Sequence, residues 1–264
     1  MTGPPLRVRR ELGRRRTLSG ACTEGHGGRG PRPESENAVA AMFGRIVFRY
    51  DMLNRILSLG CDRLWRARLA EAARSGATGR ILDLATGTFD VALALHARYP
   101  DIIVPAVDFC LPMLKKGRDK LCGGARGRVL PVAGDAARLP LPDASVDSIT
   151  MAFGIRNMRA RHAVFAEMLR VLAPGGLACI LEFASGKKRI WGGVYNLYLN
   201  YLLPGLGRLI SGDKDAYAYL AGTISDFPDA AALEKELRGA GFARTRFERF
   251  FAGVVCLHVA EKAR

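Results

Sequence analysis

A group of small and acidic residues in the first half of the chain has the types and spacing needed to hold a nucleoside. Asp83 ends a short apolar run, and a turn containing Thr86, Gly87 and Thr88 follows it. Small residues let the backbone of such a turn approach a ligand closely. Asp108 ends the next apolar run, where a carboxylate can accept hydrogen bonds from both ribose hydroxyls. In a parallel sheet these positions meet at one edge, so they predict a cofactor of the adenosine type.

Asp135 and Ala136 follow the third apolar run and extend this pattern. An acid there can accept a hydrogen bond from an adenine amino group. A single Asp in such a place more often caps a helix or lies in a solvated loop, but acids at three strand ends favour a shared site. The fuller G-x-G-x-x-G pattern that a pyrophosphate requires is absent. The turn after Asp83 therefore suits an uncharged, sulfonium-linked amino acid better than a dinucleotide.

Short apolar runs alternate with amphipathic segments through the middle of the chain, which predicts an α/β fold with helices on both faces of a parallel sheet. Two β-rich runs near the C-terminus are joined by only Ala252 and Gly253, which favours an antiparallel hairpin. A Rossmann-like, seven-stranded, mostly parallel sheet with such a hairpin is the outline of class I methyltransferases. The expected strands are 81–84, 102–107, 129–133, 146–152, 177–182, 245–251 and 254–259, and the expected helices are 90–98, 112–121, 161–172 and 230–240.

The N-terminal third predicts two further units. Residues 37–74 have apolar residues at helical spacing with a break at Gly60, so we expect a helical cap on a domain that spans 37–264 and carries an inserted segment at 184–228. Eight arginines but only three glutamates precede Ser35, among many glycines and prolines. The composition of residues 1–36 therefore predicts a disordered basic tail, or a start codon placed upstream of the true one.

The composition limits the class of partner. The net charge is +15, which suits nucleic acid, an anionic membrane surface or an acidic substrate. Much of this excess precedes Ser35, which weakens the case for nucleic acid. Six cysteines without a C-x-x-C pair predict reduced, buried thiols rather than disulfides or zinc. No stretch has the length and apolar purity of a transmembrane helix.

From about Met42 to the C-terminus, the chain resembles the ubiquinone/menaquinone biosynthesis C-methyltransferase family. Together and in this order, the matching pieces are hard to reach by chance. They are Met42-Phe43, Arg49 to Asn54, Leu57 to Gly60, Leu64 to Arg66, Phe153 to Asn157, Val171 to Gly176, Leu181 to Phe183, Asp215 to Leu220, and Ala252 to Val255 before His258.

This resemblance implies S-adenosylmethionine as cofactor, with contacts at the threonine of the first turn and after each of the next three strands. The positions are Thr88, Asp108, Asp135 with Ala136, and Ala152. Two departures from the family pattern bear on cofactor affinity. Phe89 stands where the family has a glycine, so its ring either packs into the following helix or crowds the site. Ala152 replaces a frequent serine, so its contact would be through the backbone.

The resemblance also implies methyl transfer to a ring carbon of a polyprenylated quinol. A cation beside the phenolic oxygen would stabilise the phenolate that makes the ring carbon nucleophilic. Arg156 is our candidate for that cation, and Asn157 could orient the ring oxygen or a water. Alternatively, Arg156 pairs with a helix carboxylate and is structural. Further candidates for acid/base or ring-packing roles are Tyr50, Tyr195, Tyr217 and His258.

The uncharged segment 190–207 predicts either a lid over the quinol or an ordinary buried helix. The basic residues 187–189 beside it could rest on anionic headgroups, so we expect a cytoplasmic protein with peripheral membrane contact. A homodimer and a quinone-biosynthesis complex both remain open, and no nucleic acid partner is expected.

Three matters stay open at this point. An RNA or other small-molecule methyltransferase could use the same fold, although no basic stripe alternates with aromatics in the core domain. Phe89 gives some support to the alternative that the chain is a scaffold protein that keeps the fold without the chemistry. The head group could be a benzoquinol or a naphthoquinol, and we favour demethylmenaquinol because bacterial members of the family commonly act on it and the Ala/Gly/Arg-rich composition looks bacterial.

Overall fold

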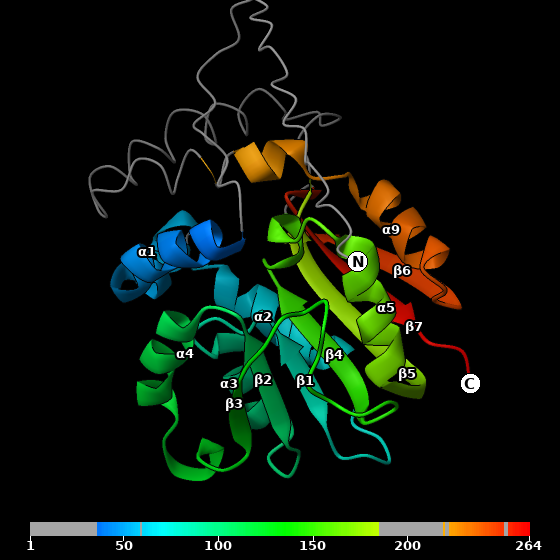
Figure 1. Cartoon of the computed structure of the whole chain (residues 1–264), viewed down its shortest axis with the longest axis horizontal. Coiled ribbons are helices and arrows are strands. Elements are labelled where there is room, and N and C mark those ends of the chain that lie inside the picture. The colour runs from blue at the N-terminus through cyan, green and yellow to red at the C-terminus, as the bar shows by residue number, and fades with distance from the viewer. Residues whose placement is uncertain (1–35, 59, 185–218, 220–221, 251–252) are drawn as a thin grey trace, which may run out of the picture.

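The computed structural model describes residues 36–58, 60–184, 219, 222–250 and 253–264. A seven-stranded sheet forms the centre, with the strand order β3-β2-β1-β4-β5-β7-β6 (Figure 1). The first five strands pair in parallel, and β7 and β6 complete the sheet as an antiparallel pair. The fold class predicted from the sequence is therefore confirmed. The strands are β1 (Ile81–Leu84), β2 (Val104–Asp108), β3 (Val129–Ala133), β4 (Val146–Ala152), β5 (Leu172–Phe183), β6 (Arg244–Phe250) and β7 (Val255–Glu261).

Helices cover both faces of the sheet, because successive side chains of each strand point to opposite sides. One buried cluster joins α2, α3 and α4 to one face, and a second joins α5 and α9 to the other. The helices are α1 (Glu36–Leu57), α2 (Asp62–Ala72), α3 (Asp90–Arg98), α4 (Leu111–Gly117), α5 (Arg161–Val171) and α9 (Ala230–Gly239), with short 3-10 turns η1 (Arg118–Lys120), η2 (Gly123–Ala125) and η3 (Ile155–Asn157).

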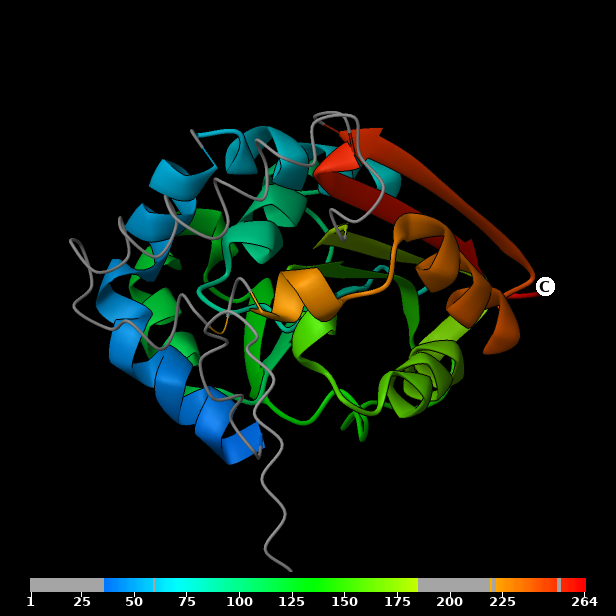
Figure 2. The same ribbon diagram turned by 90° about the horizontal axis from the view of Figure 1, so that it is seen from above.

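The helical stretch expected over 37–74 forms α1 and α2, with the break near Gly60, and α2 packs into the core on one face of the sheet. Helix α1 packs against α4 rather than on a face of the sheet. From above, α1 lies along the outer margin of the molecule, on the opposite side from the β6–β7 hairpin (Figure 2). Within the part of the chain that the structure describes, no helix is long and apolar enough to cross a membrane.

Two elements, β5 and α4, differ from the sequence prediction by more than two residues at one end. Strand β5 begins at Leu172, where the Pro-Gly-Gly segment predicted a turn, because Leu172 pairs with Val146 before a register shift. The helix expected over 112–121 ends at Gly117 and continues as the 3-10 turn η1.

Candidate functional site

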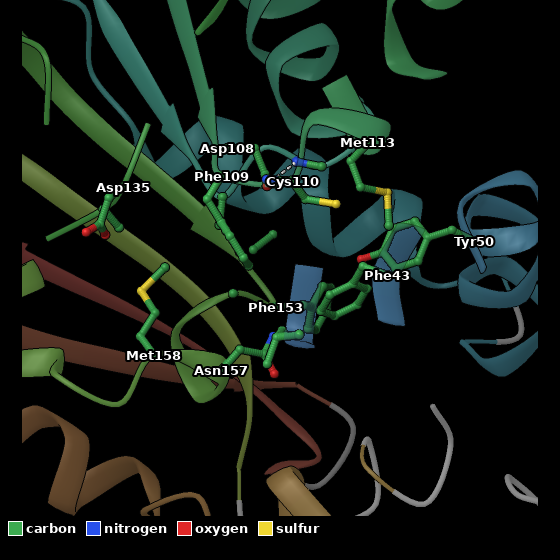
Figure 3. Close-up of a pocket in the computed structure, with 16 residues that line it drawn as sticks. Phe43, Tyr50, Asp108, Phe109, Cys110, Met113, Asp135, Phe153, Asn157 and Met158 are labelled. Atoms are coloured by element: carbon green, nitrogen blue, oxygen red, sulfur yellow. Dashed lines mark hydrogen bonds between the residues drawn. The ribbon is translucent and has the colours of Figure 1, made fainter. Parts of the chain in front are cut away.

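The ends of the first four strands and one side of α1 enclose a pocket (Figure 3). The sheet contributes a polar wall, while aromatic rings and two methionines form most of the remainder. The lining residues are Val39, Phe43, Tyr50, Ala85, Gly87, Asp108, Phe109, Cys110, Met113, Asp135, Ala136, Ala152, Phe153, Gly154, Asn157 and Met158.

Asp108 is the buried acid of this pocket. One carboxylate oxygen accepts a hydrogen bond from the backbone N–H of Gly87 at 2.8 Å, and the other accepts from the N–H of Cys110 at 2.8 Å. Burial raises the pKa of Asp108, and these backbone amides oppose the shift. The carboxylate is thus fixed in orientation, and each oxygen keeps a lone pair for a ligand.

The first turn presents bare backbone to the pocket. Gly87 has φ +58°, and no atom lies within 4 Å of the place where its Cβ would stand. Behind it, the turns after β1 and β4 touch, since a Cβ on Gly154 would come within 2.7 Å of Ala85 Cβ. An open glycine beside a fixed acid has room for the ribose and methionine parts of an adenosine sulfonium cofactor.

Asp83 and Thr86 lie beneath the turn and are not among the residues that line the pocket. The Asp83 carboxylate accepts hydrogen bonds from the hydroxyls of Thr86 at 2.5 Å and Thr150 at 2.9 Å. Burial raises the pKa of Asp83 to about 7, and the two threonines only partly counter this. In this geometry, both residues brace the turn from below.

Thr88 also lies outside the pocket lining, in a charged network that the sequence analysis missed. Its hydroxyl donates to Asp51 of α1 at 2.6 Å and accepts from Lys120 at 3.0 Å. The Lys120 ammonium further pairs with Asp51 at 2.6 Å and with Asp90 at 2.7 Å, and Asp90 pairs with Arg66 at 3.0 Å. The network fastens α1 to the turn that carries Gly87. Its members are separated by up to 69 positions in the chain, from Asp51 to Lys120, so no local motif reveals it.

Phe89 points away from the pocket. Its ring is fully buried in the core on the α2, α3 and α4 face, and it is not among the pocket residues. Its backbone has φ +69°, a conformation that L side chains rarely adopt. Of the two outcomes foreseen for Phe89, the structure therefore shows packing into the helices rather than crowding of the site. The feature that favoured an inactive scaffold is thereby removed.

The predicted residues after the third and fourth strands reach the pocket. Asp135 lies exposed at its edge and accepts a hydrogen bond from the backbone N–H of Ala137 at 2.8 Å. Ala136 and Ala152 also line it. Asn157 enters from η3, and its Oδ1 accepts a hydrogen bond from the Tyr219 hydroxyl at 3.1 Å, which leaves the Asn157 Nδ2 group as a donor.

Arg156 is not among the residues that line the pocket, and its guanidinium has a carboxylate partner. Its Nη1 contacts Glu182 of strand β5 at 2.7 Å and the carbonyl of Phe153 at 2.6 Å. Both side chains are almost fully buried. Burial raises the pKa of Glu182, and the Arg156 charge opposes this. The Nε atom of Arg156 is buried without a hydrogen-bond partner among the described residues. Arg156 thus makes the structural pair foreseen as an alternative, although with a strand carboxylate.

The other candidate side chains differ in position. Tyr50 lines the pocket, and burial raises the pKa of its phenol. His258 lies on β7, outside the pocket lining, where its Nε2 contacts the carbonyl of Ala230 at 2.9 Å. Tyr195, Tyr217 and the segment 187–207 lie outside the described residues. The sequence analysis did not anticipate the apolar wall contributed by Phe109, Met113 and Met158. Phe109 and Met158 lie in loops and carry no periodic signal, and helical spacing does not distinguish Met113 of α4 from a core residue.

Comparison with known proteins gives the family of this chain. The model of the ubiE/COQ5 methyltransferase family matches residues 32–262. The demethylmenaquinone methyltransferase of Deinococcus radiodurans is 41% identical over 233 residues, covering 88% of this chain and 96% of that protein. The enzyme of the same name from Thermus thermophilus is 45% identical over 222 residues, covering 84% and 100%. A ubiquinone/menaquinone biosynthesis C-methyltransferase UbiE from Geobacter sulfurreducens is 38% identical, covering 87% and 90%.

Solved structures at low sequence identity share the fold. A SAM-dependent methyltransferase from Thermotoga maritima, a possible histamine N-methyltransferase, aligns with a TM-score of 0.60 at 18% identity, covering 84% of this chain and 98% of that one. The [4+2]-cyclase SpnF aligns with a TM-score of 0.60 at 18% identity, covering 89% and 98%. The fold alone therefore does not fix the reaction. The family match over most of the chain does: this protein belongs to the ubiE/COQ5 methyltransferase family and is an S-adenosylmethionine-dependent methyltransferase.

Proposed function

We propose that this protein methylates a ring carbon of demethylmenaquinol. The observation that carries the proposal is one pocket in which Asp108 and the bare Gly87 backbone face a wall of aromatic rings and methionines. A polar half suits a nucleoside, and an apolar half suits a lipophilic ring. Relatives at 41% and 45% identity are named demethylmenaquinone methyltransferases, which favours the naphthoquinol head group.

Cofactor binding is proposed for the polar half. Asp108 accepts hydrogen bonds from the ribose hydroxyls, Asp135 and Ala136 lie beside the adenine, and Ala152 contributes backbone contact. Gly87 lets the chain approach the methionine portion. The bound cofactor supplies an electrophilic methyl group on a positively charged sulfur. Asp83, Thr86 and Thr88 act on this half indirectly, by holding the turn in place.

The apolar half is proposed to hold the quinol ring. Phe43, Phe109 and Phe153 would pack against it, which keeps water away and aligns the reacting carbon. Tyr50 stays protonated, because burial raises its pKa, and can donate a hydrogen bond. Asn157 Nδ2 is a second donor for a ring oxygen.

Arg156 does not line the pocket, so it is proposed to favour the phenolate from a distance, as a positive charge that Glu182 partly offsets. Its buried Nε without a described partner supports a role beyond the ion pair with Glu182. The phenol would give its proton to water, and the ring carbon would take the methyl group as the bond between that methyl and sulfur breaks, which leaves the cofactor as a neutral thioether. The methylated carbon would then lose its proton to water or a base, and the phenolate so formed would take up a proton to give the quinol.

The proposal is tested with quinones from cells that lack the protein and with the purified chain. We expect mass spectrometry to show demethylmenaquinone accumulating, and the purified protein to transfer labelled methyl from S-adenosylmethionine to reduced demethylmenaquinone. A protein that methylates only a benzoquinol would overturn the head-group assignment. A protein that binds the cofactor but methylates neither quinol would overturn the substrate class.

A further inference from the structure

Helix α1 has an exposed apolar stripe on the side that turns away from the pocket. Phe48, Met52 and Ile56 are 82%, 47% and 39% exposed. Residues four apart share one face of a helix, so these three form a continuous stripe. Phe43 and Tyr50, seven apart, lie on the pocket side of the same helix. A row of large apolar side chains in water is unusual on a helix whose other side already packs against the protein.

Basic side chains border this stripe. Arg45 and Arg55 are exposed on α1, and Lys115 is exposed on the neighbouring α4. The ammonium of Lys116 lies 5.7 Å from the centroid of the Phe48 ring. The only acid between residues 41 and 57 is Asp51, and its carboxylate is paired with Lys120. The surface thus combines apolar groups with an excess of positive charge. No exposed acid of α1 lies within it, although the exposed Asp119 carboxylate lies 3.9 Å from the Lys116 ammonium.

We propose that this stripe docks the protein on the surface of an anionic lipid bilayer. An amphipathic helix with large apolar residues and flanking Lys and Arg lies in the interface plane, with its apolar side among the acyl chains. Positive side chains beside it bind anionic headgroups. A second copy of this chain is a poorer occupant, because a symmetric contact between two stripes would bring arginines against arginines.

The position of α1 indicates how this docking would bring the substrate to the pocket, an inference that rests on the proposed function. Helix α1 lies along the margin of the molecule (Figure 2), and one side of it lines the pocket. If its outer side rests on lipid, the bilayer lies one helix thickness from the quinol ring. A prenylated acceptor can then keep its tail in the membrane while its ring enters the pocket past α1.

Vesicle binding tests the inference without any substrate. The full chain is mixed with vesicles of phosphatidylcholine alone, or of phosphatidylcholine with phosphatidylglycerol, and the bound fraction is measured by sedimentation. We expect binding to the phosphatidylglycerol vesicles that weakens by about tenfold in a Phe48→Ser, Met52→Ser, Ile56→Ser triple variant. Leu130→Ser is the matched control, since Leu130 is 41% exposed on β3. This variant should bind the vesicles as the unaltered protein does.

Cofactor titration and turnover complete the design. The triple variant should keep its affinity for S-adenosylmethionine and its turnover of a short-chain, detergent-dispersed quinol, and lose turnover of a long-chain quinol held in vesicles. Unchanged vesicle binding in the triple variant would overturn the docking surface, as would a dimer that the triple variant converts to a monomer. Intact vesicle binding without turnover of either quinol would instead count against the proposed function alone.

Discussion

The ring of Phe89 lies directly beneath Gly117, the last residue of α4. A Cβ atom on Gly117 would come within 2.6 Å of Phe89 Cδ2 and 2.9 Å of the Thr88 carbonyl carbon. The aromatic side chain in the first turn is thus accommodated by a residue that has no side chain, 28 positions later.

Gly117→Ala should therefore destabilise the protein, although alanine favours helix more than glycine does. Overpacking a core costs about 1–3 kcal/mol. Gly239→Ala is the matched control, because Gly239 also ends a helix and has no atom within 4 Å of its missing Cβ. We expect Gly239→Ala to be neutral or slightly stabilising in urea unfolding. Equal effects of the two substitutions would contradict close packing of Phe89 against α4.

Asp108→Ala should weaken binding of S-adenosylmethionine by roughly ten- to a hundredfold, since a hydrogen bond to a charged group is worth about 1.5–3 kcal/mol. Calorimetric titration measures this directly. Asp119→Ala removes an acid whose side chain is 78% exposed, and it should leave the affinity unchanged. A dissociation constant that is the same for both variants would rule out ribose binding by Asp108.

Asp83 should give the protein a distinctive pH dependence. Burial raises its pKa from an ordinary value of 3.8 to about 7 in the folded state. Between these values the folded protein holds a proton that the unfolded chain has lost, so this group makes the free energy of unfolding fall as pH rises through that window. Asp83→Asn should lose this contribution. Urea unfolding of both proteins at several pH values gives the comparison, and parallel curves would refute the assignment.

The ion pair between Arg156 and Glu182 allows structural and chemical roles to be separated. Arg156→Met alone leaves a buried carboxylate unpaired, which should cost about 3–5 kcal/mol of stability. Arg156→Met with Glu182→Leu should recover most of that loss. We expect turnover at saturating cofactor to stay low in both variants. Turnover that recovers along with stability would show that Arg156 acts only through the fold.

Lys120 should control the attachment of α1 to the cofactor turn. Lys120→Met removes the cation between Asp51 and Asp90, so the two acids repel each other and α1 opens more often. Amide exchange in α1 should become about tenfold faster, which corresponds to roughly 1.4 kcal/mol of local opening free energy. Exchange in β4 should not change. Lys235→Met, which removes an exposed lysine of α9, is the control.

The sequence predicts most of the sheet because its strands are short apolar runs with clear ends. The bounds of β1, β3, β4 and α3 agree with the prediction. The start of β5 was wrong, since the pairing of Leu172 with Val146 is a long-range contact that outweighs the local turn signal of Pro174 and Gly175.

For the site, strand ends predict which residues come near the pocket but not the direction of each side chain. Asp108, Asp135 and Ala152 line the pocket, whereas Asp83 and Thr86 turn beneath it. The direction depends on pleat and turn geometry, and a shift of one position along a strand reverses it. The network around Lys120 is beyond sequence reasoning for another reason, because it joins separate elements whose mutual placement is set by packing.

The contact between Ala85 and Gly154 closes the floor of the pocket to enlargement. Any side chain at Gly154 would collide with Ala85 of the neighbouring turn. Volume for a different acceptor must therefore come from the outer boundary, where Val39 and Phe43 of α1 stand. An engineer who wished to admit a bulkier ring would redesign that helix and leave the strand ends untouched.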